Sequence, residues 1–180
     1  MIYLMRHGQT DWNVMRKMQG QSDIPLNEMG RQQARDAQPR VAELYFDLVY
    51  ASDLSRAYET AQLATEGKFE IVKDERLRER SFGDFEQRIF TEVSEQEWRQ
   101  FSENPREYGA EAFQDMFDRV KSFFDELPSD KKVLIVTHGL AITMMLYYAE
   151  HAKFNEQEYI DNYMMLKIDN TSITEWNQVH

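Results

Sequence analysis

Short apolar runs alternate with amphipathic segments along most of this chain, a pattern typical of α/β proteins. One run begins the chain and ends on Arg6-His7-Gly8, and a second, residues 133–136, ends on Thr137-His138-Gly139. Continuous apolar runs of this length predict strands that are buried on both faces, as in a parallel sheet. Ligands of open parallel sheets bind where the strands end. The repetition therefore predicts two histidines at one edge of a single sheet.

The rest of the pattern predicts further strands and several helices. Apolar runs predict strands at residues 47–51, 69–72, 163–168 and 172–176. Helical spacing predicts helices at residues 10–13, 54–67, 113–127 and 140–151, and two consecutive helices after Asn27, the second opened by Pro39. Ser52 or Asp53 is expected to cap the 54–67 helix, and the charged residues 74–88 to form an ordered loop. This alternation predicts a three-layer αβα sandwich of the α/β class, with helices on both faces of a mostly parallel central sheet.

Arg56 lies near the predicted start of the 54–67 helix, where exposed N–H groups and the helix dipole favour anions. A guanidinium there suits phosphate, and we expect Arg56 to join Arg6, His7 and His138 at the sheet edge. Taken singly, each residue has a plainer interpretation, such as a strand end that meets solvent or a surface arginine. The interpretation as a site depends on their occurring together.

Glu79 adds a carboxylate from the predicted loop. Two histidines and a carboxylate also match a triad that binds iron. Two neighbouring arginines would repel a dication, whereas they complement a phosphate dianion. The residues therefore predict phosphate chemistry with a histidine nucleophile and no metal.

Composition narrows the class of protein. The 180 residues are 42% hydrophobic and contain no linker-like tract, which predicts one domain spanning residues 1–180. A net charge of −11 disfavours partners such as nucleic acid or an anionic membrane, and the absence of cysteine excludes disulfides and thiolate chemistry. Because the first strand begins at Met1 and no apolar run is long enough to span a membrane, we expect a cytoplasmic protein.

Several motifs together resemble the histidine phosphatase superfamily, also called phosphoglycerate mutase-like, over nearly the whole chain. The matching residues are Arg6-His7-Gly8-Gln9-Thr10 with Asn13; Gly20, Asp23, Pro25-Leu26, Gly30 and Gln33-Ala34; Ser52-Asp53-Leu54-Ser55-Arg56-Ala57 with Thr60; Leu77, Glu79 and Gly83; Thr137-His138-Gly139; and Asn170-Thr171-Ser172-Ile173. Each motif alone is weak. Their order and spacing are specific.

The resemblance implies a phosphoglycerate mutase-like fold and a role for each site residue. It implies that His7 becomes phosphohistidine, that Arg6, Arg56 and His138 bind the phosphoryl group, and that Glu79 is the proton donor. The residues implied to bind substrate are Gly8, Gln9, Thr10, Asn13, Gln19, Gly20 and Gly139. No cofactor is implied. These roles suit phosphoryl transfer, which asks a protein mainly for alignment and for charge stabilisation.

Two departures from the family pattern bear on the reaction. The chain lacks the adjacent arginine pair of the glycolytic mutases, and Gln87 stands where many family phosphatases have glycine. We therefore expect hydrolysis of a small phosphomonoester, with mutase-type transfer or non-catalytic binding of a phosphorylated ligand as alternatives. The leaving group is expected near residues 80–112 and Arg16-Lys17, with Trp98, Arg99, Arg106 and Tyr108 as candidates. A monomer or a homodimer is expected.

Overall fold

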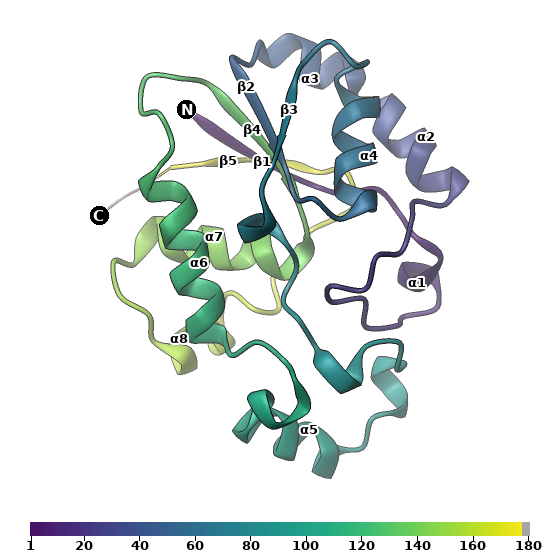
Figure 1. The fold of residues 1–180 in the computed structure, drawn as a ribbon, viewed down its shortest axis with the longest axis vertical. Coiled ribbons are helices and arrows are strands. Elements are labelled where there is room, and N and C mark those ends of the chain that lie inside the picture. Colours follow the sequence, from purple (N-terminus) through teal and green to yellow (C-terminus); the bar gives the residue numbers. More distant parts are fainter. Residues whose placement is uncertain (178–180) are drawn as a thin grey trace.

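A five-stranded sheet forms the middle of the structure, a computed structural model that describes residues 1–177 (Figure 1). Its strands are β1 (Ile2–Arg6), β2 (Leu48–Ala51), β3 (Ile71–Lys73), β4 (Val133–Thr137) and β5 (Ile173–Trp176), in the order β3-β2-β4-β1-β5. β5 pairs antiparallel with β1, and the other strands are parallel. This arrangement confirms the predicted α/β class with a mostly parallel central sheet.

The register of β1 and β4 places the two strand-end histidines side by side. Ile2 pairs with Val133 and Arg6 pairs with Thr137, so both strands end at the same level. The backbone N–H of His7 continues the ladder by donating to the carbonyl of Thr137 at 2.9 Å. Equal strand lengths and a parallel pairing therefore bring His7 and His138 to one edge of the sheet, as the repeated pattern predicts.

Helices cover both faces of the sheet because successive strand residues point to opposite sides. Tyr3 and Met5 of β1 belong to a core cluster with α3 (Gln38–Leu44) and α4 (Ser55–Ala64), and α2 (Glu28–Asp36) packs on α4. Leu4 belongs to the opposite cluster. The helices on that side are α6 (Phe113–Asp125), α7 (Gly139–Glu150) and α8 (Glu156–Asn162). No helix within residues 1–177 is long and apolar enough to cross a membrane.

The helices expected at residues 10–13, after Asn27 and from Pro39 are all present, but the predicted cap of α4 is not. Thr10 forms a capping box with Asn13 at the start of α1 (Asp11–Val14), Asn27 caps α2, and Pro39 lies in the first turn of α3. The prediction that Ser52 or Asp53 caps α4 is wrong, because Leu54 occupies the N-cap position without a side-chain bond. The N–H of Ser55 instead donates to the Asp23 carboxylate at 2.7 Å, so a distant loop caps this helix.

The predicted strand at residues 163–168 is also wrong. This segment leaves α8 through a turn and then runs without regular structure to β5. Met164 and Ile168 pack against the core on the α6–α7 side instead of pairing with a strand. A backbone carbonyl of the segment, that of Ile168, accepts a hydrogen bond from Arg6 Nη1. The apolar side chains of this segment therefore cover the carboxyl ends of β1 and β4, where the two histidines lie.

A small aromatic core separate from the sheet is formed by the segment of residues 82–110 together with Met18. Its buried members are Met18, Phe82, Phe85, Val93, Phe101 and Ala110. A short 3₁₀ turn at Glu75–Leu77 precedes this segment. The segment contains α5 (Glu95–Glu103), which the sequence pattern did not predict, and 3₁₀ turns at Gly83–Phe85, Phe90–Glu92 and Pro105–Tyr108. In Figure 1 it forms the lower end of the molecule, below the carboxyl ends of the central strands. Residues 74–88 are an ordered loop containing two of these turns.

Gln87 has a left-handed backbone, with φ of 72°. Its N–H donates to the carbonyl of Met18 at 2.9 Å, which holds the turn in place. Because glycine adopts this conformation without steric cost, Gln87→Gly is expected to stabilise the fold by about 0.5–1 kcal/mol in urea unfolding. The control is Gln96→Gly, which puts glycine in α5 and should destabilise by a similar amount. A loss of stability in Gln87→Gly would contradict the argument.

Candidate active site

His7 has its Nδ1 atom 2.6 Å from the carbonyl oxygen of Gly8. A carbonyl can only accept, so Nδ1 carries the proton and Nε2 keeps its lone pair. The side chain is 3% exposed, and burial, with the charges of Arg56 and Arg6, holds the pKa of His7 well below its usual value. The imidazole is therefore neutral near pH 7, with a nucleophilic nitrogen at Nε2.

His138 lies beside His7, with 5.1 Å between the ring centroids. Its Nε2 is 2.9 Å from the hydroxyl of Ser52, which also accepts the N–H of Leu54 at 3.3 Å. We assign the Ser52 hydroxyl as the donor to Nε2, because its oxygen already accepts an N–H group; the imidazole proton then lies on Nδ1. Burial, followed by the charge of Arg56, lowers the pKa of His138 well below its usual value, so the ring is a neutral hydrogen-bond donor.

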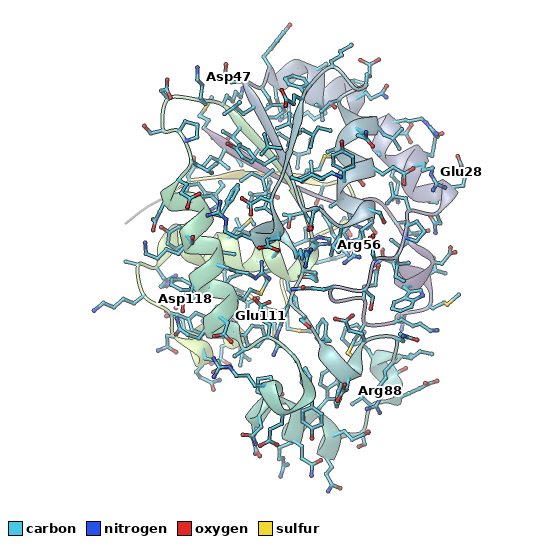
Figure 2. All side chains as sticks on the ribbon, viewed as in Figure 1. Glu28, Asp47, Arg56, Arg88, Glu111 and Asp118 are labelled. Atoms are coloured by element: carbon cyan, nitrogen blue, oxygen red, sulfur yellow. The ribbon has the colours of Figure 1, made fainter. Side chains whose placement is uncertain are left out.

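Arg56 lies near the centre of the molecule, between the sheet and the α5 region (Figure 2). Its side chain is 1% exposed. Nη1 donates to the carbonyl of Ser22 at 2.8 Å and Nη2 donates to that of Gly20 at 2.7 Å. Burial lowers the pKa of Arg56 to about 10, which leaves it charged at neutral pH. A loop thus holds the guanidinium by two nitrogens.

Three buried side-chain nitrogens have no hydrogen-bond partner within the described residues. They are Arg6 Nε, Arg56 Nε and His138 Nδ1. Arg6 and Arg56 line a cavity of about 210 Å³ together with His7, the ring that neighbours His138. Leaving buried donors unpaired costs free energy, of order 1–3 kcal/mol each, which an anion in the cavity would offset. Two cations and a neutral donor around a nucleophile suit a phosphoryl group.

Glu79 also lines the cavity, where its carboxylate faces the first turn of α7. Its Oε1 accepts the N–H groups of Arg80 at 3.0 Å and Ala141 at 3.1 Å, while Oε2 accepts that of Leu140 at 3.1 Å. A Cβ on Gly139 would lie 3.8 Å from Glu79 Oε2 and from the guanidinium of Arg6. The carboxylate therefore faces the same space as the phosphate-binding groups.

The residues expected to bind substrate divide into two groups. Asn13, Gln19, Gly20 and Gly139 line the cavity. Gly8, Gln9 and Thr10 lie behind its wall, and each has a structural partner. The N–H of Gly8 donates to the Thr60 hydroxyl, and a Cβ there would lie 2.4 Å from the carbonyl oxygen of Gly30. The N–H of Gln9 donates to Gln33, and Thr10 caps α1.

Several residues that shape the site were not predicted from the sequence. Glu86 Oε1 accepts the N–H of Gln21 at 3.0 Å and Oε2 accepts that of Ser22 at 2.9 Å, so this carboxylate fixes the loop that holds Arg56. The outer cavity is lined by Lys17, Phe82 and Phe90, which lie in the two regions expected to meet the leaving group. It is also lined by Leu140, Met164, Leu166 and Ile168, which were not predicted. The expected contacts of the leaving group, Trp98, Arg99, Arg106 and Tyr108, do not line it. No signal in the sequence marked Leu166, which lies far from the matched motifs.

Comparison with known proteins identifies the family. A family model described as "Histidine phosphatase superfamily (branch 1)" matches residues 2–178. The chain belongs to this superfamily. Phosphoglycerate mutase-like protein 4 of Arabidopsis thaliana is 34% identical over 196 residues, which cover 99% of this chain and 85% of that protein.

Two solved structures are similar in fold to this member of the superfamily. A mycobacterial glucosyl-3-phosphoglycerate phosphatase, solved with VO3, has a TM-score of 0.80 and 28% identity, covering 96% of this chain and 88% of its own. A mutant phosphoserine phosphatase from Entamoeba histolytica, solved with phosphoserine, has a TM-score of 0.78 and 25% identity. The match covers 96% of this chain and 87% of that one. Both phosphatases and mutase-like proteins thus resemble the chain.

The two neutral histidines of the site predict a pH dependence of the free energy of unfolding. Because both pKa values are lower when folded, the unfolded chain binds more protons below its own histidine pKa near 6.5. Stability should therefore fall as pH drops from about 6.5, by up to about 1.4 kcal/mol per pH unit for each imidazole. Urea unfolding at pH 7.5, 6.5 and 5.5 measures this.

The matched comparison for this pH dependence is His7→Ala. The carboxylates contribute equally to the pH dependence of the free energy of unfolding in both proteins, so their contribution cancels in the comparison. The variant should therefore lose about half of the histidine-dependent slope of the free energy of unfolding against pH. Equal slopes in wild type and variant would contradict the burial of a neutral His7.

Proposed function

We propose that the protein is a metal-independent phosphomonoesterase that hydrolyses a small phosphorylated metabolite through phospho-His7. The observation that carries the proposal is the set of three buried, unpaired nitrogens of Arg6, Arg56 and His138. Arg6 and Arg56 line one cavity with His7, and the His138 ring lies beside the His7 ring. The positive charge that a phosphoryl group needs comes from the two arginines, so these steps require no metal.

In the first half-reaction, His7 Nε2 attacks phosphorus and the bond to the leaving oxygen breaks. A proton from Glu79 goes to that oxygen, and an alcohol departs. Oε2 accepts one N–H group whereas Oε1 accepts two, so Oε2 has the freer position for the proton. Arg6, Arg56 and His138 stabilise the charge on the equatorial phosphoryl oxygens.

In the second half-reaction, water attacks the phosphorus of phospho-His7. Glu79, now ionised, takes a proton from the water and returns to its acid form. The P–N bond breaks, inorganic phosphate leaves, and His7 is again neutral with its lone pair on Nε2. One water is consumed for each ester.

Mutase-type transfer is the nearest alternative and has support from the name of the Arabidopsis relative. A mutase must hold a phosphoglycerate carboxylate while both ends of the substrate exchange phosphate. Within the described lining of the cavity, Lys17 is the cation that remains when Arg6 and Arg56 bind phosphate. This favours hydrolysis. A purely binding role would require no nucleophile, whereas His7 has a free lone pair.

The deciding experiment is the fate of phosphate. Purified protein in excess chelator, given p-nitrophenyl phosphate and separately 3-phosphoglycerate, should release inorganic phosphate from the aryl ester, with inhibition by vanadate. Isomerised phosphoglycerate without inorganic phosphate would establish a mutase instead. Inertness towards a broad panel of esters, with binding of phosphate retained, would establish a binding module.

Glu79→Gln tests the proton donor. It should slow phosphorylation of His7 by about 10²–10⁴-fold with alkyl phosphates, whose alkoxides leave poorly. The effect should be much smaller with p-nitrophenyl phosphate, because its phenolate leaves without a proton. Rapid-quench measurement of the phosphorylation burst is needed, since the same carboxylate activates water in the second step. Equal slowing for both substrates would show that Glu79 only positions other groups.

A further inference from the structure

The cavity changes character from its inner to its outer end. The buried side chains of His7 and Arg56 form the inner end with Arg6, and Phe90 and Leu166, each 45% exposed, mark the outer end. The outer wall is mainly apolar, although Lys17 also lies in the lining. Its apolar side chains come from three separate parts of the chain and are Phe82, Phe90, Leu140, Met164, Leu166 and Ile168. A phosphate bound at His7 would therefore direct its ester group against hydrocarbon.

Side-chain acceptor atoms that could bind hydroxyls of a leaving group are already engaged. The Thr143 hydroxyl donates to the carbonyl of Leu140 at 2.9 Å and lies 2.8 Å from the hydroxyl of Tyr159. Asn13 Oδ1 accepts the N–H of Thr10, and Gln19 Oε1 accepts its hydroxyl. These contacts engage the acceptor atoms of the three side chains, so the amide N–H groups of Asn13 and Gln19 remain as donors to an oxygen of the ligand.

The outer wall also has few charged side chains that could bind a charged leaving group. Glu79 accepts three backbone N–H groups, and the remaining cation of the lining, Lys17, has its Nζ 5.6 Å from the centre of the Trp12 ring. A substrate carboxylate would find no guanidinium among the described residues there, because both arginines of the lining belong to the inner end. An acidic leaving group would therefore lose solvation without a strong partner.

Phe90 gives the outer wall a flat aromatic surface. Its ring stacks on Trp98, with centroids 6.0 Å apart and an interplanar angle of 18°, and it is edge-to-face with Phe82 at 6.3 Å. Phe90 and Leu166 are each 45% exposed, so a ligand can still bury both. The cavity volume of about 210 Å³ is somewhat larger than the ~150 Å³ that accommodates benzene.

We propose that the preferred substrates are phosphomonoesters with an uncharged, apolar leaving group of about one aromatic ring, and not phosphoglycerates, phosphoserine or sugar phosphates. This proposal rests on the proposed phosphatase function and names its substrate class. The ring lies against Phe90 and Leu166 while the phosphate occupies the inner end. The products are inorganic phosphate and an apolar alcohol or phenol.

Phosphate release from four esters tests the preference: benzyl phosphate, n-propyl phosphate, glycerol 3-phosphate and 3-phosphoglycerate. Propyl and glycerol esters have the same number of carbons and differ in hydroxyl groups. The expected kcat/KM order is benzyl above propyl above glycerol, with benzyl at least about tenfold above glycerol, as burial of one ring predicts. A kcat/KM for glycerol 3-phosphate or 3-phosphoglycerate equal to or above that for benzyl phosphate would overturn the proposal.

Two variants locate the preference on the outer wall. Phe90→Ser and Leu166→Ser should each lower kcat/KM for benzyl phosphate by about fivefold or more while changing that for glycerol 3-phosphate by less than about twofold. The matched control is Val72→Ser, an exposed apolar residue of β3 that does not line the cavity. Equal losses for both esters in Phe90→Ser and Leu166→Ser would overturn the assignment of the wall.

Binding to His7→Ala separates this inference from the proposed function. Calorimetry with this variant should give the same order, benzyl phosphate tighter than glycerol 3-phosphate, without any turnover. If wild type releases no phosphate but the variant keeps this order, hydrolysis is wrong and the ligand class stands. If wild type hydrolyses p-nitrophenyl phosphate but the binding order is reversed, the ligand class is wrong and hydrolysis stands.

Discussion

His7→Ala is expected to reduce kcat by at least about 10⁴-fold and to abolish formation of the phosphoenzyme. The nucleophile is lost, and His138 cannot replace it, because its Nε2 is hydrogen-bonded to the Ser52 hydroxyl at 2.9 Å. The fold should persist, since the His7 side chain is held by a local hydrogen bond to the carbonyl of Gly8. Circular dichroism and thermal unfolding check this.

The control for His7→Ala is His151→Ala. His151 stacks on Tyr147 at the end of α7 and pairs with Glu158, away from the residues that line the cavity. Its removal should leave kcat unchanged.

The phosphoenzyme itself gives a positive test. Rapid quench of wild type with labelled substrate should trap phosphate on His7 in an acid-labile, base-stable form, and His7→Ala should trap none. Label on a serine or a carboxylate would refute the mechanism, whatever the loss of activity in the variant.

The sequence could predict those parts of the site that strand ends define. The apolar runs of β1 and β4 end on the same type of motif, and parallel pairing in register places His7 and His138 together. The fold class followed from the same alternation of strands and helices. Local signals, such as the Thr10 capping box and Pro39 in the first turn of α3, were also sufficient because each acts within one turn.

Features that depend on distant contacts could not be predicted. The cap of α4 is Asp23, 32 residues away from Ser55, and no local pattern reveals it. Residues 163–168 resemble a strand in sequence because hydrophobicity alone does not distinguish a paired strand from a covering segment. The apolar outer wall likewise combines segments far apart in the chain. The helix α5 is a different case, because its Ser94–Glu97 capping box is a local helix-start signal that the sequence contains and that the prediction overlooked.

Gln87 illustrates how the family pattern and the backbone combine. The sequence showed that Gln87 replaces a common glycine, but only the φ of 72° shows that the backbone still has the conformation that glycine favours. The turn is held by the contact between Gln87 and Met18, and Met18 belongs to the small aromatic core. Tertiary packing therefore maintains a turn that the local sequence disfavours.

Arg56→Lys is expected to lower kcat by about 10²–10³-fold, although the charge is kept. The guanidinium makes two kinds of contact at once. Nη1 and Nη2 donate to the carbonyls of Ser22 and Gly20, while Nε is buried and unpaired beside the cavity. A single lysine ammonium cannot reach both carbonyls and still donate along the direction of Nε.

Two comparisons separate loss of the phosphate contact from loss of the loop. Arg99→Lys, at an exposed position outside the cavity, should match wild type and shows the effect of the exchange alone. Glu86→Gln loosens the same loop from its other side, at Gln21 and Ser22, while keeping Arg56. Glu86→Gln should lower the thermal stability. It should reduce kcat much less than Arg56→Lys does, because the guanidinium still faces the phosphoryl group.

The inhibition constant of vanadate provides the final distinction. Arg56→Lys should weaken vanadate binding along with kcat, because vanadate takes the place of the transferring phosphoryl group. Equal losses of kcat in Arg56→Lys and Glu86→Gln, with vanadate inhibition unchanged in both, would show that Arg56 acts only by holding residues 20–22. Kinetics close to wild type in Arg56→Lys would refute both roles, because a lysine could then replace every contact that the guanidinium makes.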